Sequence, residues 1–358
     1  MAGFNDRRPN RDEQREERRR EAARHTGLMK AAFGRETDEA IENARIYEEG
    51  EGRSLLWGAE AAAAARAAKA AAEMAEADAE GAQAGNEEAR EAAEIAEEAA
   101  ETAEAEEAAD PDGAAGAAPT ATETTVKVVT SFAPEALYRD ATGKTMIVDP
   151  GAFTRPGGAY EDGAFGPEQI LCSESNLYPI LVAHKRDFYD KNRDYRRGSL
   201  FTDRALYVPE VLFSRGGDVR RADVLVIAEP IRAYALENHR SERECDKALA
   251  DRIETIFRVA AANGAETLIM GAFGCGRNGY PVEQVIELIQ NWIAEHPGAV
   301  PNVVLAVPRM HADAFREAFG APEPERPAPV VVAEGENDRE GDDEDWRNVE
   351  LPEGVTLR

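Results

Sequence analysis

The sequence has few cysteines, few aromatic residues, a shortage of positive charge and no long apolar run. Only three of its 358 residues are cysteines. They are too scattered for a disulfide scaffold, and no CxxC pair indicates zinc. Acidic residues outnumber basic ones by 70 to 42, which gives a formal net charge of −28. Because so negative a surface repels phosphates, we expect neither DNA nor a lipid membrane as a partner.

The targeting features of the sequence are equally sparse. No stretch approaches the roughly 18 apolar residues of a membrane-spanning helix. The N-terminal region is rich in Arg and Glu and holds no apolar run, so we expect no signal peptide and no anchor. These features predict a cytoplasmic protein.

Charge is unevenly distributed, and two segments carry most of it. Residues 58–125 form an Ala/Glu-rich low-complexity insertion and linker, in which 59–108 carry a charge of −12. Helix propensity is high there, but large apolar side chains are almost absent. The segment is therefore a solvated helix, a loose coiled coil or disordered. Residues 321–358 are Pro-rich and then acid-rich, and predict a disordered acidic tail.

The folded structure is expected in the two remaining parts. Residues 1–57 have apolar residues at spacings of three and four, which predict an N-terminal helical portion packing on the main domain. In 126–320, short apolar runs alternate with helical patterns at 249–260 and 282–293, which predicts an α/β domain with a partly parallel sheet. The runs expected to be strands are Val126–Val129, Thr145–Val148, Val224–Ala228, Thr267–Gly271 and Val303–Val307.

Two glycine-rich loops follow expected strands. Arg155-Pro156-Gly157-Gly158-Ala159-Tyr160 comes soon after the strand that ends at Asp149, and Gly274-Cys275-Gly276-Arg277-Asn278-Gly279 follows the strand 267–271. Glycines let backbone N–H groups approach an anion, and ligands of α/β sheets bind at the carboxyl ends of strands. The loops therefore predict a phosphate-bearing ligand, although glycines that only make turns would give the same pattern.

The second loop matches the GxGxxG pattern of dinucleotide-binding folds. That pattern normally opens the first βαβ unit and is followed by an acidic residue about 20 positions on. Here it lies late in the domain, and the next strand ends in Val307-Pro308-Arg309 with no acidic residue. A dinucleotide oxidoreductase is therefore disfavoured.

The region of the first loop resembles the microbial type of poly(ADP-ribose) glycohydrolase, a divergent macrodomain. The family has a strand ending in Asn, a Pro-Gly-Gly-Gly loop, then Gln-Glu-Glu and a Leu-Cys…Ser-x-Leu-Tyr helix. This chain has Asp149, Pro156-Gly157-Gly158-Ala159, Pro167-Glu168-Gln169 and, over 171–178, Leu-Cys-Ser-Glu-Ser-Asn-Leu-Tyr. Residues 260–276 are similar to the family's diphosphate-loop region.

The resemblance implies a macrodomain-like mixed sheet flanked by helices, with ADP-ribose lying across the two loops. It implies hydrolysis of the ribose–ribose linkages of ADP-ribose polymers, free or attached to proteins, and no metal or redox cofactor is indicated. The ligand-binding candidates that it implies are Asp149, Gly157, Gly158 and Ala159 near the first loop, and Gly274, Cys275, Gly276, Arg277, Asn278 and Gly279 in the second.

The departures from the family pattern concern the catalytic positions. In the family, the second Glu of Gln-Glu-Glu does the acid/base work of glycoside cleavage. The matching residue here is Gln169, which exchanges no proton at neutral pH, so Glu168 is the one carboxylate nominated beside it. Ala159 replaces the third glycine, Asp149 the strand-end Asn, and Asn278 an aromatic residue. The main alternative function is therefore that of a non-catalytic ADP-ribose reader. The third possibility is an α/β module that binds a different nucleotide.

Other candidates keep two interpretations each. Tyr160, Phe165 and Phe273 stack on adenine or belong to the core. Cys275 is expected to be a small buried residue rather than a nucleophile. The locally basic segment 183–200 is a solvated surface beside the sheet or a surface that attracts a polyanion.

Overall fold

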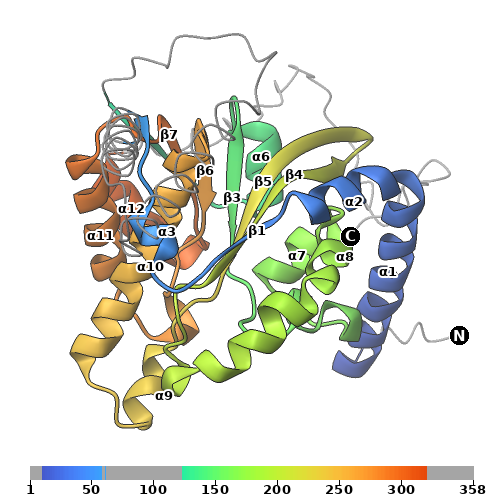
Figure 1. Cartoon of the computed structure of the whole chain (residues 1–358), viewed down its shortest axis with the longest axis horizontal. Helices are drawn as coiled ribbons and strands as arrows, with labels where there is room; N and C mark the ends of the chain where they lie inside the picture. The colour runs from blue at the N-terminus through green and yellow to red at the C-terminus, as the bar shows by residue number, and fades with distance from the viewer. Residues whose placement is uncertain (1–9, 59–60, 62–122, 321–358) are drawn as a thin grey trace, which may run out of the picture. The chain divides into compact units, whose positions relative to one another are not determined.

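The computed structural model describes residues 10–58, 61 and 123–320 (Figure 1). The chain divides into two compact units, Met1–Ala321 and Pro322–Arg358, and every element below belongs to the first. The predictions for the tail 321–358 and for nearly all of the insertion 58–125 concern residues outside the described ones.

The centre of the domain is a mixed sheet with the strand order β1-β4-β5-β3-β6-β7-β2. Strands β5, β3, β6, β7 and β2 run parallel to one another, while β4 is antiparallel to β5 and to β1. The strands are β1 (Arg45–Tyr47), β2 (Thr125–Val129), β3 (Thr145–Asp149), β4 (Ala205–Arg215), β5 (Asp218–Ile227), β6 (Thr267–Met270) and β7 (Asn302–Ala306). All five strands expected from apolar runs are present and the fold class is confirmed; β1 and β4 lie outside those runs.

Helices cover both faces of this sheet (Figure 1). One face carries α1 (Arg11–Ala32), α2 (Gly34–Glu42), α6 (Ala133–Arg139), α7 (Pro167–Ser173) and α8 (Leu177–Ala183). The other carries α3 (Glu51–Ser54), α9 (Arg232–Glu237), α10 (Glu242–Ala262), α11 (Val282–Glu295) and α12 (Arg309–Phe319). Because the faces are covered separately, strand residues alternate between two apolar cores: Met146 and Val148 enter one, and Ile147 the other.

Helix α10 follows the signals expected from its sequence. Ser241 caps its start, accepting a hydrogen bond from the Glu244 N–H while the Glu244 carboxylate accepts one from the Ser241 N–H. The helix ends at Ala262, where Asn263 caps it and Gly264 adopts a left-handed conformation (φ +66°).

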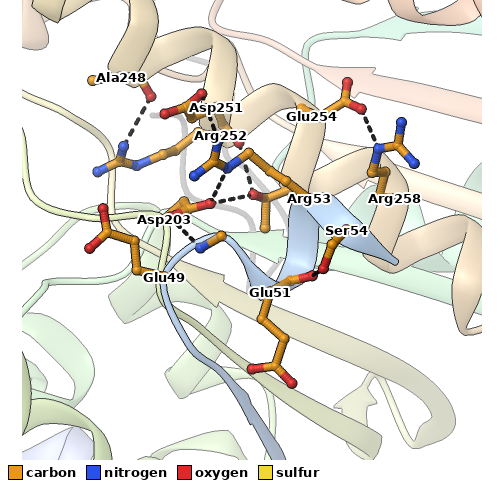
Figure 2. A network of polar contacts seen from close by, with 12 residues as sticks. Glu49, Glu51, Arg53, Ser54, Asp203, Ala248, Asp251, Arg252, Glu254 and Arg258 are labelled. Carbon is orange, nitrogen blue, oxygen red and sulfur yellow. Dashed lines mark hydrogen bonds and ion pairs between the residues drawn. The ribbon is translucent and has the colours of Figure 1, made fainter. Parts of the chain in front are cut away.

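A polar network fixes the short helix α3 to α10. Arg53 donates to Asp203 at 2.6 Å and to Asp251 at 3.2 Å. The Gly50 N–H and the Thr255 hydroxyl donate to the same Asp203 carboxylate. Figure 2 shows this arrangement, with Arg53 between the two aspartates. The segment that precedes residues 58–125 is thus attached to α10 by partly buried charge-assisted contacts.

No helix in the described ranges is long and apolar enough to cross a membrane.

The carboxyl ends of β3, β5 and β6 meet at one edge of the sheet, because these strands are parallel neighbours. The first glycine-rich loop follows β3, the second follows β6, and Glu229 follows β5. That edge is where the candidate residues gather.

Candidate active site

Asp149 lies at the carboxyl end of β3 and is completely buried. Neither carboxylate oxygen has a hydrogen-bond partner among the described residues. Burial raises the pKa of Asp149 to about 8, because an unpaired charge is costly away from water. The raised pKa favours the protonated form of this side chain.

Glu168 lies in the first turn of α7 and is 5% exposed. Its Oε2 accepts a hydrogen bond from the Ala152 N–H at 3.0 Å, and its Oε1 has no partner in the described part of the chain. Burial raises the pKa of Glu168 well above its usual range, and the neighbouring Asp149 raises it further. Hydrogen bonding to the backbone of Ala152 and Gly157 opposes this shift only in part.

Gly151 separates the two acids and leaves space between them. A Cβ at this position would lie 3.4 Å from Glu168 Oε1 and 3.6 Å from Asp149 Oδ2. It would also lie 2.5 Å from a methyl group of Val226, too close to be tolerated. Only glycine fits here, so both unpartnered oxygens face one region beside the backbone. We call Asp149 and Glu168 the carboxylate pair.

The first loop, residues 155–163, has three successive left-handed residues: Gly157 (φ +63°), Gly158 (φ +52°) and Ala159 (φ +73°). At Gly158 a Cβ would lie 2.3 Å from Glu168 Oε2, so glycine is required for the loop to lie against this acid. Ala159 adopts the left-handed conformation despite its Cβ, at a cost of about 1–2 kcal/mol. Where the family pattern has a third glycine, this chain keeps a glycine-like backbone.

Gln169 braces the loop. Its Nε2 donates to the carbonyl oxygens of Gly157 at 2.9 Å and Gly158 at 3.3 Å. The same nitrogen lies 3.5 Å from Glu168 Oε2. The Gln169 amide group therefore holds the loop backbone that lies against the carboxylate pair. The Glu168 carboxyl group lies between this loop and the end of β3.

Helix α1 covers the first loop from outside. The Arg15 and Arg18 side chains donate to the carbonyl oxygens of Asp162 and Gly163 at 2.8 and 2.9 Å. A Cβ at Gly163 would lie 2.1 Å from the Arg15 carbonyl oxygen, so the helix packs directly on the loop. The arginines of this charged N-terminal stretch thus position the loop beside Glu168.

The second loop, residues 274–279, is held by a residue that the sequence analysis missed. Glu229 accepts hydrogen bonds from the Gly274 N–H at 2.7 Å and from Asn278 Nδ2 at 2.5 Å. Burial raises the pKa of Glu229 to about 7, although both donors oppose the shift. Two of the expected ligand donors are engaged with this carboxyl group. Its position directly after the buried run of β5 is the signal that could have identified it.

The other members of the second loop are arranged as follows. Gly276 (φ +69°) faces open space, and Gly279 (φ +87°) lies close to Ala233. Arg277 is exposed and has no hydrogen bond or ion pair with any residue that the structure describes. Burial raises the pKa of Cys275 to about 12, so this side chain stays a thiol rather than a nucleophilic thiolate.

The three aromatic candidates separate by exposure. Tyr160 and Phe273 are 5% and 2% exposed and belong to the cores, whereas Phe165 is 67% exposed. Phe165 lines a pocket of about 370 Å³ between α1 and the first loop, together with Arg18, Tyr160 and Gln169. Within the described ranges, no group of three or more His, Cys, Asp or Glu side chains could hold a metal ion.

Comparisons with known proteins agree on one relationship. A family model described as the catalytic domain of microbial-type PARG matches residues 29–216. No curated protein matches the chain. The crystal structure of poly(ADP-ribose) glycohydrolase (PARG) from Thermomonospora curvata matches with a TM-score of 0.58 at 21% identity, covering 85% of this chain and 98% of that one.

Two further structures resemble the fold. Poly(ADP-ribose) glycohydrolase from Thermomonospora curvata bound to the inhibitor ADP-HPD has a TM-score of 0.56 at 19% identity, with 85% of this chain and 98% of that chain covered. The enzyme from Deinococcus radiodurans in complex with ADP-ribose has a TM-score of 0.50 at 22% identity, with 56% and 86% covered. At these identities the structural likeness concerns the fold.

Proposed function

This chain belongs to the microbial-type poly(ADP-ribose) glycohydrolase family, and we propose that it cleaves ribose–ribose linkages of ADP-ribose polymers in the cytoplasm, with Glu168 as the catalytic acid. Its substrates are polymers that are free or attached to ADP-ribosylated proteins. In the same proposal, residues 126–320 form the ADP-ribose-binding and hydrolase domain, and 1–57 pack on it. The contacts of α1 with the first loop support this division.

The observation that carries the proposal is the carboxylate pair beside the first loop. Glu168 is buried, one of its oxygens has no partner among the described residues, and burial followed by the neighbouring Asp149 raises its pKa, which favours the protonated form. A protonated carboxyl group is what a departing ribose oxygen requires, because that oxygen must gain a proton as its bond to the anomeric carbon breaks.

The chemistry then takes two steps on one side chain. Glu168 donates its proton to the leaving oxygen, and the anomeric carbon acquires oxocarbenium character. The resulting carboxylate accepts a proton from the water that attacks this carbon, which restores the acid and completes hydrolysis. Asp149 lies beside the ribose in this arrangement, while Gly276 and Arg277 of the second loop receive the diphosphate.

Substitution of Glu168 tests the proposal. Glu168→Gln removes the proton that is transferred and keeps the side-chain size, so we expect release of ADP-ribose from the polymer to fall by at least about 100-fold. ADP-ribose affinity should change only a few-fold. Glu174→Gln, at the opposite end of α7, is the matched control and should retain turnover. Unchanged turnover in Glu168→Gln would remove Glu168 from the mechanism.

A non-catalytic ADP-ribose reader is the second candidate. The observation that favours it is the commitment of Gln169 to the loop carbonyls at the position where the family has its acid/base Glu. A reader would bind ADP-ribose tightly, release none from polymer, and show no difference between wild type and Glu168→Gln in the turnover assay.

A further inference from the structure

A second hollow, which we name the outer pocket, lies beside the first loop and has a volume of about 660 Å³. Four of its nine lining residues are cationic. The residues that matter are Arg155, Lys185, Arg193, Arg196, Tyr178 and Glu161. Four cations in one hollow contrast with the formal net charge of −28 of the whole chain.

The basic segment 183–200 supplies three of these cations. It folds as a succession of short helical turns, Lys185–Asp190, Lys191–Tyr195 and Arg197–Ser199. Phe188 and Tyr189 are 2% and 0% exposed, so they anchor the segment in the core. The cations are therefore presented from an attached surface rather than from a free loop.

The charges of the outer pocket are only partly compensated. Asp190 pairs with both Lys185 at 2.8 Å and Arg193 at 3.1 Å, so one carboxylate serves two cations. Arg155 pairs with Asp162 at 2.6 Å and with Glu161 at 3.2 Å. Arg196 is exposed and has no ion pair with a residue in the described ranges. Four cations thus face three carboxylates, and a net positive charge remains.

Tyr178 connects the outer pocket to the carboxylate pair. Its hydroxyl donates to Glu161 at 2.5 Å inside the pocket. A Cβ at Gly157 would lie 2.8 Å from the ring of Tyr178. The next residue, Gly158, lies against Glu168 Oε2. The outer pocket and Glu168 therefore flank the same two residues of backbone.

We propose that the outer pocket binds a diphosphate of the polymer unit next to the one whose ribose lies at Glu168. This inference rests on the proposed function. Each polymer unit repeats a doubly charged diphosphate, so a chain leaving the carboxylate pair brings its next diphosphate to nearby cations. Guanidinium groups fit phosphate oxygens with two parallel hydrogen bonds. ADP-ribose itself has one diphosphate, which occupies the second loop, so the outer pocket distinguishes polymer from monomer.

Charge reversal at Arg196 tests this assignment. Arg196→Glu removes the unpaired cation without breaking an ion pair that the structure records. We expect it to weaken binding of an oligomer of about ten ADP-ribose units by about tenfold at low salt, and to lower the slope of log affinity against log salt by about 0.7–0.9 per lost phosphate contact. ADP-ribose affinity should change less than about twofold. Arg193→Ala should weaken oligomer binding in the same direction.

Arg243→Glu is the matched control, because Arg243 is an exposed cation of α10 and not a lining residue of the outer pocket. It should leave both affinities unchanged. Equal oligomer affinity in wild type and Arg196→Glu, with ADP-ribose binding intact, would overturn the outer-pocket proposal alone. Absence of ADP-ribose binding in wild type would instead overturn the proposed function. Equal affinity for single-stranded RNA of matched charge would also contradict the assignment.

Discussion

Replacing Asp149 by asparagine should change how the stability of this protein depends on pH. The carboxyl group is completely buried without a partner among the described residues, and burial raises its pKa from 3.8 to about 8. Because the folded-state pKa lies above the unfolded one, this group's contribution is fully present below about pH 4 and is lost as the pH rises through about 8. Asparagine has the same shape and does not titrate.

The magnitude follows from the pKa shift. One pKa unit corresponds to about 1.36 kcal/mol, so the raised pKa of Asp149 lowers the free energy of unfolding of wild type by about 4 kcal/mol between pH 5 and pH 8. The free energy of unfolding of Asp149→Asn, relative to wild type, should therefore rise by about 4 kcal/mol over that range. Whatever the asparagine amide itself costs is the same at each pH and cancels.

Urea unfolding at several pH values measures this difference. Trp57 and Trp292 pack against each other, with ring centroids 5.8 Å apart, and their fluorescence reports loss of the folded domain. Asp223→Asn is the control, because Asp223 is also buried but accepts hydrogen bonds from the Tyr207 hydroxyl and the Glu210 N–H. It should destabilise the protein rather than stabilise it at high pH. Parallel stability curves for wild type and Asp149→Asn would refute the reasoning.

Two further predictions concern the two glycine-rich loops. Gly158→Ala should abolish turnover, because its Cβ would lie 2.3 Å from Glu168 Oε2. Gly216→Ala is the control, because Gly216 has φ +61° and open space around it; this variant should lose about 1–2 kcal/mol of stability and no activity. Glu229, whose pKa burial raises to about 7, should repel the diphosphate once it ionises. ADP-ribose affinity of wild type should therefore fall from pH 6 to pH 8 by calorimetry, and Glu229→Gln should remove the trend; the same trend in both proteins would exclude Glu229 as its cause.

In the main domain, the sequence predicted the positions of strands and helices whose residues are buried in a regular pattern. The runs at 145–148 and 267–270 are buried on both faces, so largely apolar sequence identifies them. Strand β4 escaped this pattern because its middle residues Pro209 and Glu210 are not buried and interrupt the apolar run with a bulge. Strand β1 has three residues, too few for any periodicity.

Local patterns located the candidate site only in part. The first loop was identified from its glycines, and the structure places Asp149, Gly158 and Glu168 together there. The position of Glu229 directly after β5 is a local signal, but its role in holding the second loop is not, because that role depends on contacts with residues 45 and 49 positions away. The engagement of Asn278 with Glu229 also depends on tertiary packing. Long-range pairing of single polar side chains leaves no local signature in a sequence.

Calorimetric titration of ADP-ribose into the intact protein tests the central claim most directly. Gly276 faces open space, so Gly276→Glu places a negative charge at the expected diphosphate position, and Gly276→Gln adds the same bulk without charge. We predict micromolar binding by wild type, weaker but measurable binding by Gly276→Gln, and none by Gly276→Glu. Absence of binding by wild type, or equal binding by all three proteins, would contradict an ADP-ribose site across the two loops.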